Sequence, residues 1–240
     1  RVASEAGLEL EIIPADEEAR LAVIGCAPLI DRRARRVIVV DIGGGSTELT
    51  VIEPDDSLAD GLRRIDWVSL PLGVVTMADR FGGGDVPPAI YRAMRAEVSG
   101  RLVDLAARVA VDDHIAAGAV QLVGTSGTLT TLAGVHFDLA SYDRGRVDGR
   151  QVTVAGIRET AERLRAMDLA DRGRHPCVGR SRADLVVPGA AIMEGVCDAF
   201  PVTGLTVADR GLREGMLYEM IAAHRSSRRR PDRRGGGRRT

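Results

Sequence analysis

Lysine is absent from the 240-residue sequence, so all 33 basic residues are arginine. Arginine presents planar forks that suit phosphate groups, but codon usage in a GC-rich genome produces the same pattern. The missing lysine therefore carries no functional conclusion. The formal net charge of −1 also gives no sign of a polyanionic partner, and we expect no nucleic-acid partner.

Cysteine and histidine are both sparse. The three cysteines, Cys26, Cys177 and Cys197, show no CxxC spacing, and the four histidines lack the pairing that a zinc site requires. We interpret these residues as packing or surface residues. The sequence therefore offers no transition-metal site, although it leaves oxygen-ligand sites open.

Long apolar runs are missing as well. No run approaches the roughly 18 residues that can span a bilayer, and the first ten residues, RVASEAGLEL, lack the apolar core of a signal peptide. We expect a cytoplasmic protein with no membrane partner. With 45% hydrophobic and 28% charged residues, the composition is that of a globular protein of one large domain or two lobes.

The first part of the chain predicts three elements in order: the end of a helix, then a strand, then a second helix. Gly7 suits the left-handed position that ends a helix, and the apolar residues of 8–13 predict a strand. After the acidic segment Asp16 to Arg20, a helical stretch is expected to about Pro28, followed by a basic linker, DRRARR. Because this interpretation places the first residue inside a helix, we expect the chain to be part of a longer protein.

The middle of the chain predicts a β-sheet. The β-branched run RVIVVDI, residues 36–42, is typical of a buried strand. The segment ELTVIE predicts a second strand that forms a hairpin with the first around the glycine-rich GGGST. A third strand is expected over 65–70, and the run AVQLVG, residues 119–124, predicts another buried strand.

Helices are expected over four later segments. Six apolar residues after Pro88 recur every three or four positions and predict one long amphipathic helix: Ile90, Met94, Val98, Leu102, Leu105 and Val109. Further helices are expected at about 156–167, 189–200 and 212–224, the last after a short LTV strand and with Asp209 as its N-cap. The Arg-rich tail 225–240 contains no apolar residue and is expected to be disordered. We find no internal repeat.

The motif DIGGGSTE, Asp41 to Glu48, gives the strongest chemical signal. Three consecutive glycines expose backbone N–H groups that can surround phosphate oxygens. If the flanking strands pair as a hairpin, Asp41 ends one strand and Glu48 begins the other, so both lie at the mouth of the glycine loop. Two carboxylates beside a phosphate become favourable with a Mg²⁺ between them, because this cation prefers oxygen ligands. A solvated hairpin tip is the structural alternative.

A second glycine turn, GTSGT from Gly124 to Thr128, follows a buried strand and precedes a helix. A strand, a glycine turn and a helix N-terminus together form a ready anion site. Taken alone, the motif fits a tight turn of the fold equally well.

These motifs, with SLPLGVVTMADRF, RADLVVPGAAI and DRGLREGMLYE, resemble in order and spacing the successive signatures of the exopolyphosphatase / guanosine pentaphosphate phosphohydrolase (Ppx/GppA) family. The resemblance extends to about His224. It implies an α/β protein of the actin-like ATPase fold, with two ribonuclease-H-like lobes around a phosphate-binding cleft. It also implies Mg²⁺-dependent hydrolysis of the terminal phosphate of polyphosphate or of the 5′ phosphate of pppGpp, and thus polyphosphate or guanosine penta- or tetraphosphate as partners.

The resemblance implies a role for each matching residue. Glu18, in PADEEAR, would be the general base that orients the attacking water, in preference to Glu17. Asp41 and Glu48 would hold the metal ion. Phosphate would be bound by residues of both glycine loops and by one arginine: Gly43, Gly44, Gly45, Ser46, Gly127, Thr128 and Arg182. A homodimer is implied as well, although the sequence leaves the oligomeric state open.

The sequence departs from the family pattern in two places. Nothing matches the DxGS-type phosphate loop that the family carries about one hundred residues upstream, so we expect an N-terminal truncation with one wall of the cleft missing. Asp148 stands where the resemblance leads us to expect histidine. We expect residues 1–22 to be a remnant of the first lobe, 23–208 the second lobe, 209–224 a helix that packs on the first lobe, and 225–240 the tail.

Two other functions stay open. An ATP-dependent kinase or ATPase of the same fold uses similar loops, and a non-catalytic protein that binds ppGpp or pppGpp needs only the intact lobe. The position of Glu18 ahead of the glycine loop favours water activation over a kinase.

Overall fold

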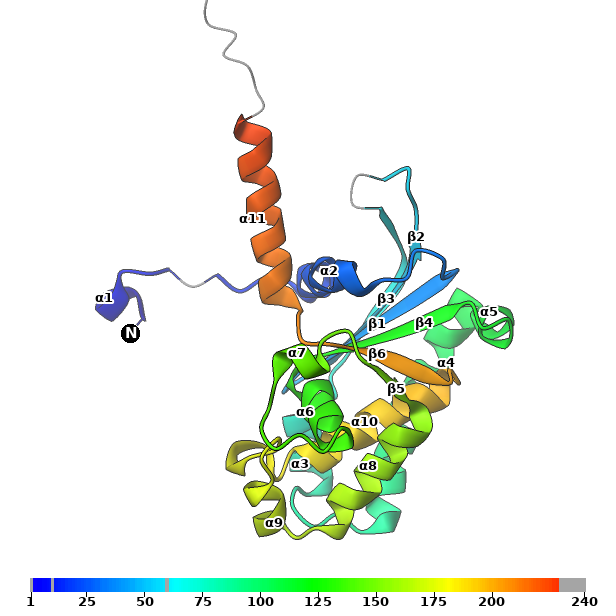
Figure 1. Ribbon diagram of the computed structural model, residues 1–240, viewed down its shortest axis with the longest axis vertical. Coiled ribbons are helices and arrows are strands. Elements are labelled where there is room, and N and C mark those ends of the chain that lie inside the picture. The colour runs from blue at the N-terminus through cyan, green and yellow to red at the C-terminus, as the bar shows by residue number, and fades with distance from the viewer. Residues whose placement is uncertain (1, 10, 59–60, 229–240) are drawn as a thin grey trace, which may run out of the picture.

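The computed structural model describes residues 2–9, 11–58 and 61–228, and its centre is a six-stranded sheet of order β3-β2-β1-β4-β6-β5 (Figure 1). The strands are β1 (Arg36–Ile42), β2 (Thr47–Pro54), β3 (Leu62–Leu70), β4 (Val120–Thr125), β5 (Gln151–Thr153) and β6 (Gly204–Ala208). β1, β2 and β3 form an antiparallel meander, β4 and β6 continue it in parallel with β1, and β5 closes the other edge antiparallel to β6. The predicted hairpin and third strand are therefore confirmed.

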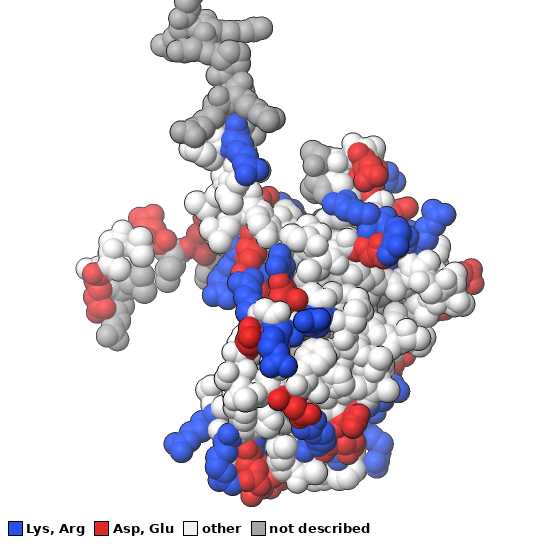
Figure 2. Space-filling model, in the orientation of Figure 1, with Lys and Arg blue, Asp and Glu red and all other residues white. Residues whose placement is uncertain are grey.

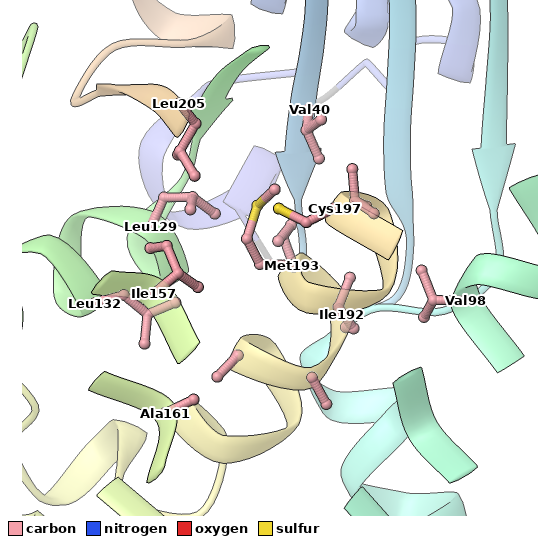
Figure 3. Close-up of a cluster of buried hydrophobic side chains, with 14 of the residues drawn as sticks. Val40, Val98, Leu129, Leu132, Ile157, Ala161, Ile192, Met193, Cys197 and Leu205 are labelled. Atoms are coloured by element: carbon pink, nitrogen blue, oxygen red, sulfur yellow. The ribbon is translucent and has the colours of Figure 1, made fainter. Parts of the chain in front are cut away.

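One face of the sheet carries the main apolar core. The helices on this side include α3 (Val74–Phe81), α4 (Pro88–Val109), α6 (Gly127–His136), α8 (Val154–Ala166) and α10 (Val186–Ala199). Figure 3 shows Val98, Leu129, Ile157 and Met193 from four of these helices converging beneath Val40 of β1. Of the predicted stripe on α4, all members but Ile90 are buried, and Ile90 packs against the core from a half-buried position.

The other face is covered more thinly by α2 (Ala15–Cys26) and the short η1 (Ala27–Leu29), and α11 (Leu212–Arg228) packs against α2. Alternate residues of a strand point to opposite faces. Val37 and Val39 accordingly contribute to the small cluster under α2, whereas Ile38 and Val40 enter the main core. Asp41 shares its parity with Val37 and Val39, so it lies on the α2 face.

The remaining helices are short: α1 (Val2–Ala6), α5 (Asp112–Ala116), α7 (Arg144–Val147), α9 (Leu169–Arg174) and η2 (Arg180–Arg182). The helix end at Gly7 is confirmed, because Gly7 has φ +63° and its N–H donates to the Ala3 carbonyl. The prediction of a strand over 8–13 is wrong for residues 8, 9 and 11–13, which the structure describes. They pair with no strand, and Leu8 and Ile12 are 61% and 95% exposed, so the apolar pattern finds no sheet partner here.

Two expectations about α11 need correction. Asp209 does not cap the helix, because its carboxylate instead accepts a hydrogen bond from the Tyr142 hydroxyl. The residue before the helix is Gly211, whose N–H donates to the Glu214 carboxylate at 2.9 Å. The helix also continues through Arg228, past the expected end at 224. The rest of the expected tail, residues 229–240, lies outside the described residues.

The expected division into lobes stays a prediction. Its first boundary, at residue 22, falls within the continuous helix α2. Among the described residues, no helix is long and apolar enough to cross a membrane.

Candidate functional site

A row of polar side chains crosses four strands on the α2 face of the sheet. Asp41 of β1 is directly opposite Glu48 of β2, as the hairpin predicted, and opposite Thr125 of β4 on the other side. Ser69 of β3 is opposite Glu48 and donates a 2.7 Å hydrogen bond to its carboxylate. Directly opposed residues of neighbouring strands point to the same face. The register therefore places Asp41 and Glu48 side by side.

Glu18 approaches this row from the first turn of α2. It is half-buried, and its pKa is raised by burial and by the nearby charge of Glu48. Glu17 is different, because its carboxylate accepts two 2.7 Å hydrogen bonds from Arg20, which lower its pKa. Of the two neighbouring acids, Glu18 is thus the one that lies in the field of Asp41 and Glu48.

The carboxyl group of Asp41 lies in a strongly perturbing environment. Burial, together with the charges of Glu48 and Glu18, raises its pKa from 3.8 to about 7. Within the described residues, no arginine forms an ion pair with Asp41, Glu48 or Glu18. A cation would relieve the repulsion among these carboxylates. The described residues hold no group of three metal-ligating side chains close enough to bind a metal ion by themselves.

The glycine loop between β1 and β2 turns its carbonyl groups towards α3. The Gly43 carbonyl accepts from the Val74 N–H at 2.9 Å, and the Gly44 carbonyl accepts from the Val75 N–H at 2.8 Å. Helix α3, which the sequence analysis did not predict, thus begins on the loop. Gly73 permits this contact, because a methyl group there would lie 2.3 Å from the Gly44 oxygen.

The N–H groups of the same loop have fewer protein partners. The Gly43 N–H closes the loop by donating to the Ser46 carbonyl at 2.9 Å. No described residue accepts a hydrogen bond from the N–H groups of Gly44, Gly45 or Ser46. Such free donors in a glycine-rich turn can bind an anion.

The second glycine turn leads into the N-terminus of α6. Ser126 has φ +94°, a strained value for a residue with a side chain, and its hydroxyl accepts from the Thr128 N–H. The Thr130 hydroxyl donates to the Ser126 carbonyl at 3.2 Å. The turn therefore holds the start of α6, with its positive end of the helix dipole, next to the first loop.

A cavity of about 300 Å³ lies between the two glycine turns. Its lining residues are Ile42, Gly43, Gly44, Val74, Ser126, Gly127, Thr128, Thr131, Arg182, Leu185 and Val186. The Arg182 guanidinium donates to the Thr131 hydroxyl at 2.9 Å and reaches over Gly127, where an added methyl group would lie 3.2 Å from it. In the described part of the chain, Arg182 forms no ion pair. Its charge is thus free to attract an anion.

A second cavity of about 180 Å³ adjoins the first, because Ser126 and Gly127 line both. Asp41 and the turn between β6 and α11 form its other walls. The structure thus brings Gly43, Gly44, Gly127, Thr128 and Arg182 to one cavity and Asp41 to the next. Gly45, Ser46, Glu48 and Glu18 line neither cavity, although Glu48 and Glu18 flank Asp41.

The sequence analysis missed the role of the turn between β6 and α11. The Arg210 carbonyl accepts a 2.6 Å hydrogen bond from the Thr125 hydroxyl, next to Asp41. The Arg210 guanidinium is held by the Asp148 carboxylate, which also accepts from the Asp209 N–H at 3.0 Å. Asp148, the departure from the expected histidine, therefore fixes this turn. The acid–base pairing of residues 148 and 210 is a tertiary contact that sequence spacing does not reveal.

Comparison with known proteins supports the same grouping of motifs. The model of the Ppx/GppA phosphatase family matches residues 1–224. Exopolyphosphatase 1 of Mycobacterium tuberculosis is 28% identical over 224 residues, which cover 92% of this chain and 61% of that relative. Exopolyphosphatase 2 of the same organism is 27% identical and covers 89% and 65%. The chain thus spans about three fifths of the length of these curated relatives.

Solved structures agree on the fold. The crystal structure of the Aquifex aeolicus member of the Ppx/GppA family matches with a TM-score of 0.76 at 26% identity, covering 93% of this chain and 68% of that one. An exopolyphosphatase from Cytophaga hutchinsonii matches with a TM-score of 0.77 at 23% identity, covering 92% and 68%. These likenesses confirm the expected α/β, actin-like ATPase fold. On the family model and the fold together, the chain belongs to the Ppx/GppA phosphatase family.

Proposed function

We propose that the full-length protein hydrolyses the terminal phosphoanhydride bond of inorganic polyphosphate and releases phosphate. The observation that carries the proposal is the convergence of two glycine turns and Arg182 on one cavity, with Asp41, Glu48 and Glu18 beside it. Both sets of groups are needed, because phosphoryl transfer requires a bound phosphate and a positioned water. The names of the exopolyphosphatase relatives support the same reaction.

In this reaction, water attacks the terminal phosphorus while the bond from that phosphorus to the bridging oxygen breaks. Glu18 accepts a proton from the water, and the bridging oxygen leaves on the shortened chain. The products are orthophosphate and a polyphosphate that is one unit shorter. The raised pKa of Glu18 suits this role, because a general base is most effective when its pKa lies near the working pH. No covalent nucleophile is required.

Mg²⁺ fits the acidic side of the site. Mg²⁺ usually binds one or two carboxylates together with water and substrate phosphates, so the lack of a three-residue cluster among the described residues is compatible with it. Asp41 and Glu48 would hold the ion, and when bound it would neutralise charge on the phosphate oxygens. The crowded carboxylates and the raised pKa of Asp41 support this assignment.

The backbone and Arg182 would bind the phosphate chain itself. The free N–H groups at Gly44, Gly45 and Ser46, and the α6 N-terminus at Gly127 and Thr128, supply donors on two sides. Arg182 adds a forked donor suited to phosphate. These groups are held by α3, by the Ser126 turn and by Thr131, so they are oriented before the substrate arrives.

Hydrolysis of the 5′ phosphate of pppGpp is the second candidate. The apolar side of the 300 Å³ cavity, formed by Ile42, Val74, Leu185 and Val186, favours a ligand that carries a flat aromatic ring next to its phosphates. Inorganic polyphosphate has no such group. Both substrates present a terminal anhydride to the same carboxylates.

The test is phosphate release by the full-length protein from polyphosphate, pppGpp and ATP, each with and without Mg²⁺. Mg²⁺-dependent release from polyphosphate supports the main proposal, and faster release from pppGpp supports the second candidate. Turnover of ATP alone would instead indicate the kinase or ATPase alternative. Binding of pppGpp without any release would indicate a binding protein.

A further inference from the structure

We infer that Arg20 and Glu219 are positioning residues that hold Glu18 in place for catalysis. The inference rests on the proposed role of Glu18. It concerns the contact between α2, which carries Glu18 in its first turn, and α11, which lies across it (Figure 1). Figure 2 shows acidic and basic side chains side by side where these helices meet the rest of the molecule.

The two helices touch backbone to backbone at two glycines. A methyl group at Gly25 of α2 would lie 2.0 Å from the Gly211 carbonyl oxygen, and one at Gly215 of α11 would lie 2.0 Å from the Leu21 oxygen. Neither position has room for a side chain. These contacts fix the middle and the C-terminal end of α2 against the start of α11.

The third contact lies four residues further along α11, at Glu219. Arg20 holds Glu219 through two hydrogen bonds, the longer of which is 3.0 Å, and also pairs with Glu17 at 2.7 Å. Gly211, Gly215 and Glu219 thus form one seam, in which each member follows the previous one by four positions. Only the last contact of this seam involves side chains.

Arg20, which makes this side-chain contact, lies two residues after Glu18 in the sequence. Pro14, which precedes α2, forms no side-chain cap, and the neighbouring described residues 7–9 and 11–12 are exposed. Directly after the first turn of α2 come the buried Ala19 and Leu21, and Arg20 between them forms the ion pair with Glu219. The pair also engages the side of the helix that bears Glu17, whereas the charge of Glu18 interacts with those of Glu48 and Asp41.

Loss of the pair should affect turnover more than folding. Arg20 and Glu219 are 40% and 43% exposed, and exposed ion pairs contribute little to stability. Displacement of a catalytic group by about 1 Å can nevertheless cost on the order of a hundredfold in rate. We expect Glu219→Ala to lower kcat on polyphosphate by roughly ten- to a hundredfold, with little change in KM.

The test is a double-mutant cycle in the full-length protein, with phosphate release from polyphosphate as the readout. Glu219→Ala is compared with Glu18→Gln and with the double variant. If Glu219 acts through Glu18, its replacement should have no further effect on kcat once Glu18 is Gln. Arg101→Met is the matched control, because Arg101 is 43% exposed and also pairs with a glutamate on its own helix, Glu97.

Two results would overturn the inference. One is a kcat for Glu219→Ala no lower than that of Arg101→Met, and the other is an equal loss of kcat in the presence and absence of the Glu18 carboxylate. If instead Glu18→Gln retains full turnover, the proposed general base is wrong, and the inference falls with it. The cycle therefore distinguishes failure of the positioning role from failure of the proposed function.

Discussion

The two faces of the sheet differ in both packing and chemistry. The face under α4, α8 and α10 is filled with apolar side chains, and Val98, Ile157 and Met193 there are completely buried (Figure 3). The face under α2 carries the row of Ser69, Glu48, Asp41 and Thr125 and only a small apolar cluster.

The difference indicates that the two faces have different roles. Packed apolar surface supplies most of the stability of a domain. The face under α4, α8 and α10, which we call the thick face, can therefore stabilise the sheet, while the face under α2, the thin face, holds charges that repel one another. The buried carboxyl group of Asp41 lines one of the two adjoining cavities, and perturbed pKa values of this kind are typical of functional sites. We therefore expect substitutions on the thick face to change stability and those on the thin face to change chemistry.

The largest expected effect on stability is on the thick face. Ile157→Ala removes a completely buried side chain of α8, and such changes lower the free energy of unfolding by about 2 to 5 kcal/mol. The activity of each folded molecule should stay the same. Urea unfolding together with phosphate release checks both quantities, and a variant of normal stability with lost turnover would break the division between the faces.

An intermediate effect is expected at the crossing of α2 and α11. Gly215→Ala forces a methyl group against the Leu21 carbonyl, and overpacking of this kind costs about 1 to 3 kcal/mol. Because the helices must separate, kcat should fall as well. Gly100→Ala in α4 is the control, since nothing lies within 4 Å of the added methyl group; it should stabilise the protein slightly. Equal effects of the two substitutions would contradict a tight crossing.

A third expected effect depends on pH. The pKa of Asp41 is about 7 in the folded protein against 3.8 ordinarily, so its ionisation opposes folding increasingly from about pH 4 to pH 7 and fully above that range. With a chelator present, Asp41→Asn should raise the midpoint of thermal unfolding at pH 8 by about 2 to 4 °C for each kcal/mol gained. The gain should vanish near pH 4, and Mg²⁺ should stabilise only the unsubstituted protein.

Asp66→Asn is a control in which loss of the carboxylate should change stability in the opposite direction. A hydrogen bond from Arg108 lowers the pKa of Asp66, so its charge stabilises the folded state at neutral pH, and that contribution is lost as the pH falls through the lowered pKa. Asp66→Asn should therefore destabilise the protein slightly at pH 8. A gain at Asp41 that does not depend on pH would show that burial of its charge is not the cause.

Much of the fold could be predicted because the signals are local. The β-branched run of β1 and the apolar stripe of α4 each specify an element and its buried face. Helix α3 was missed because its start depends on carbonyl groups of the distant glycine loop. The strand expected over 8–13 was wrong because a strand needs a partner, and an apolar pattern alone does not provide one.

The site was predictable only in part. The hairpin register that places Asp41 opposite Glu48 follows from two adjacent strands. Arg182 lies close to Gly127, and Asp148 pairs with Arg210. Each contact joins segments more than fifty residues apart, so residue spacing in the sequence could not indicate it. Glu18 was selected through the family resemblance, and its environment beside Glu48 became visible only in three dimensions.

Glu18, on the α2 face of the sheet, is the residue that we propose activates the attacking water. The most direct measurement is kcat for phosphate release from polyphosphate by full-length Glu18→Gln and Glu17→Gln, with polyphosphate binding measured in parallel. If Glu18 is the general base, kcat should fall by about 10² to 10⁴ in Glu18→Gln while polyphosphate binding is retained, which is the usual scale for a general base. Glu17→Gln, which removes an exposed ion pair, should stay within about threefold of the unsubstituted protein. A large loss for Glu17→Gln with none for Glu18→Gln would contradict the account.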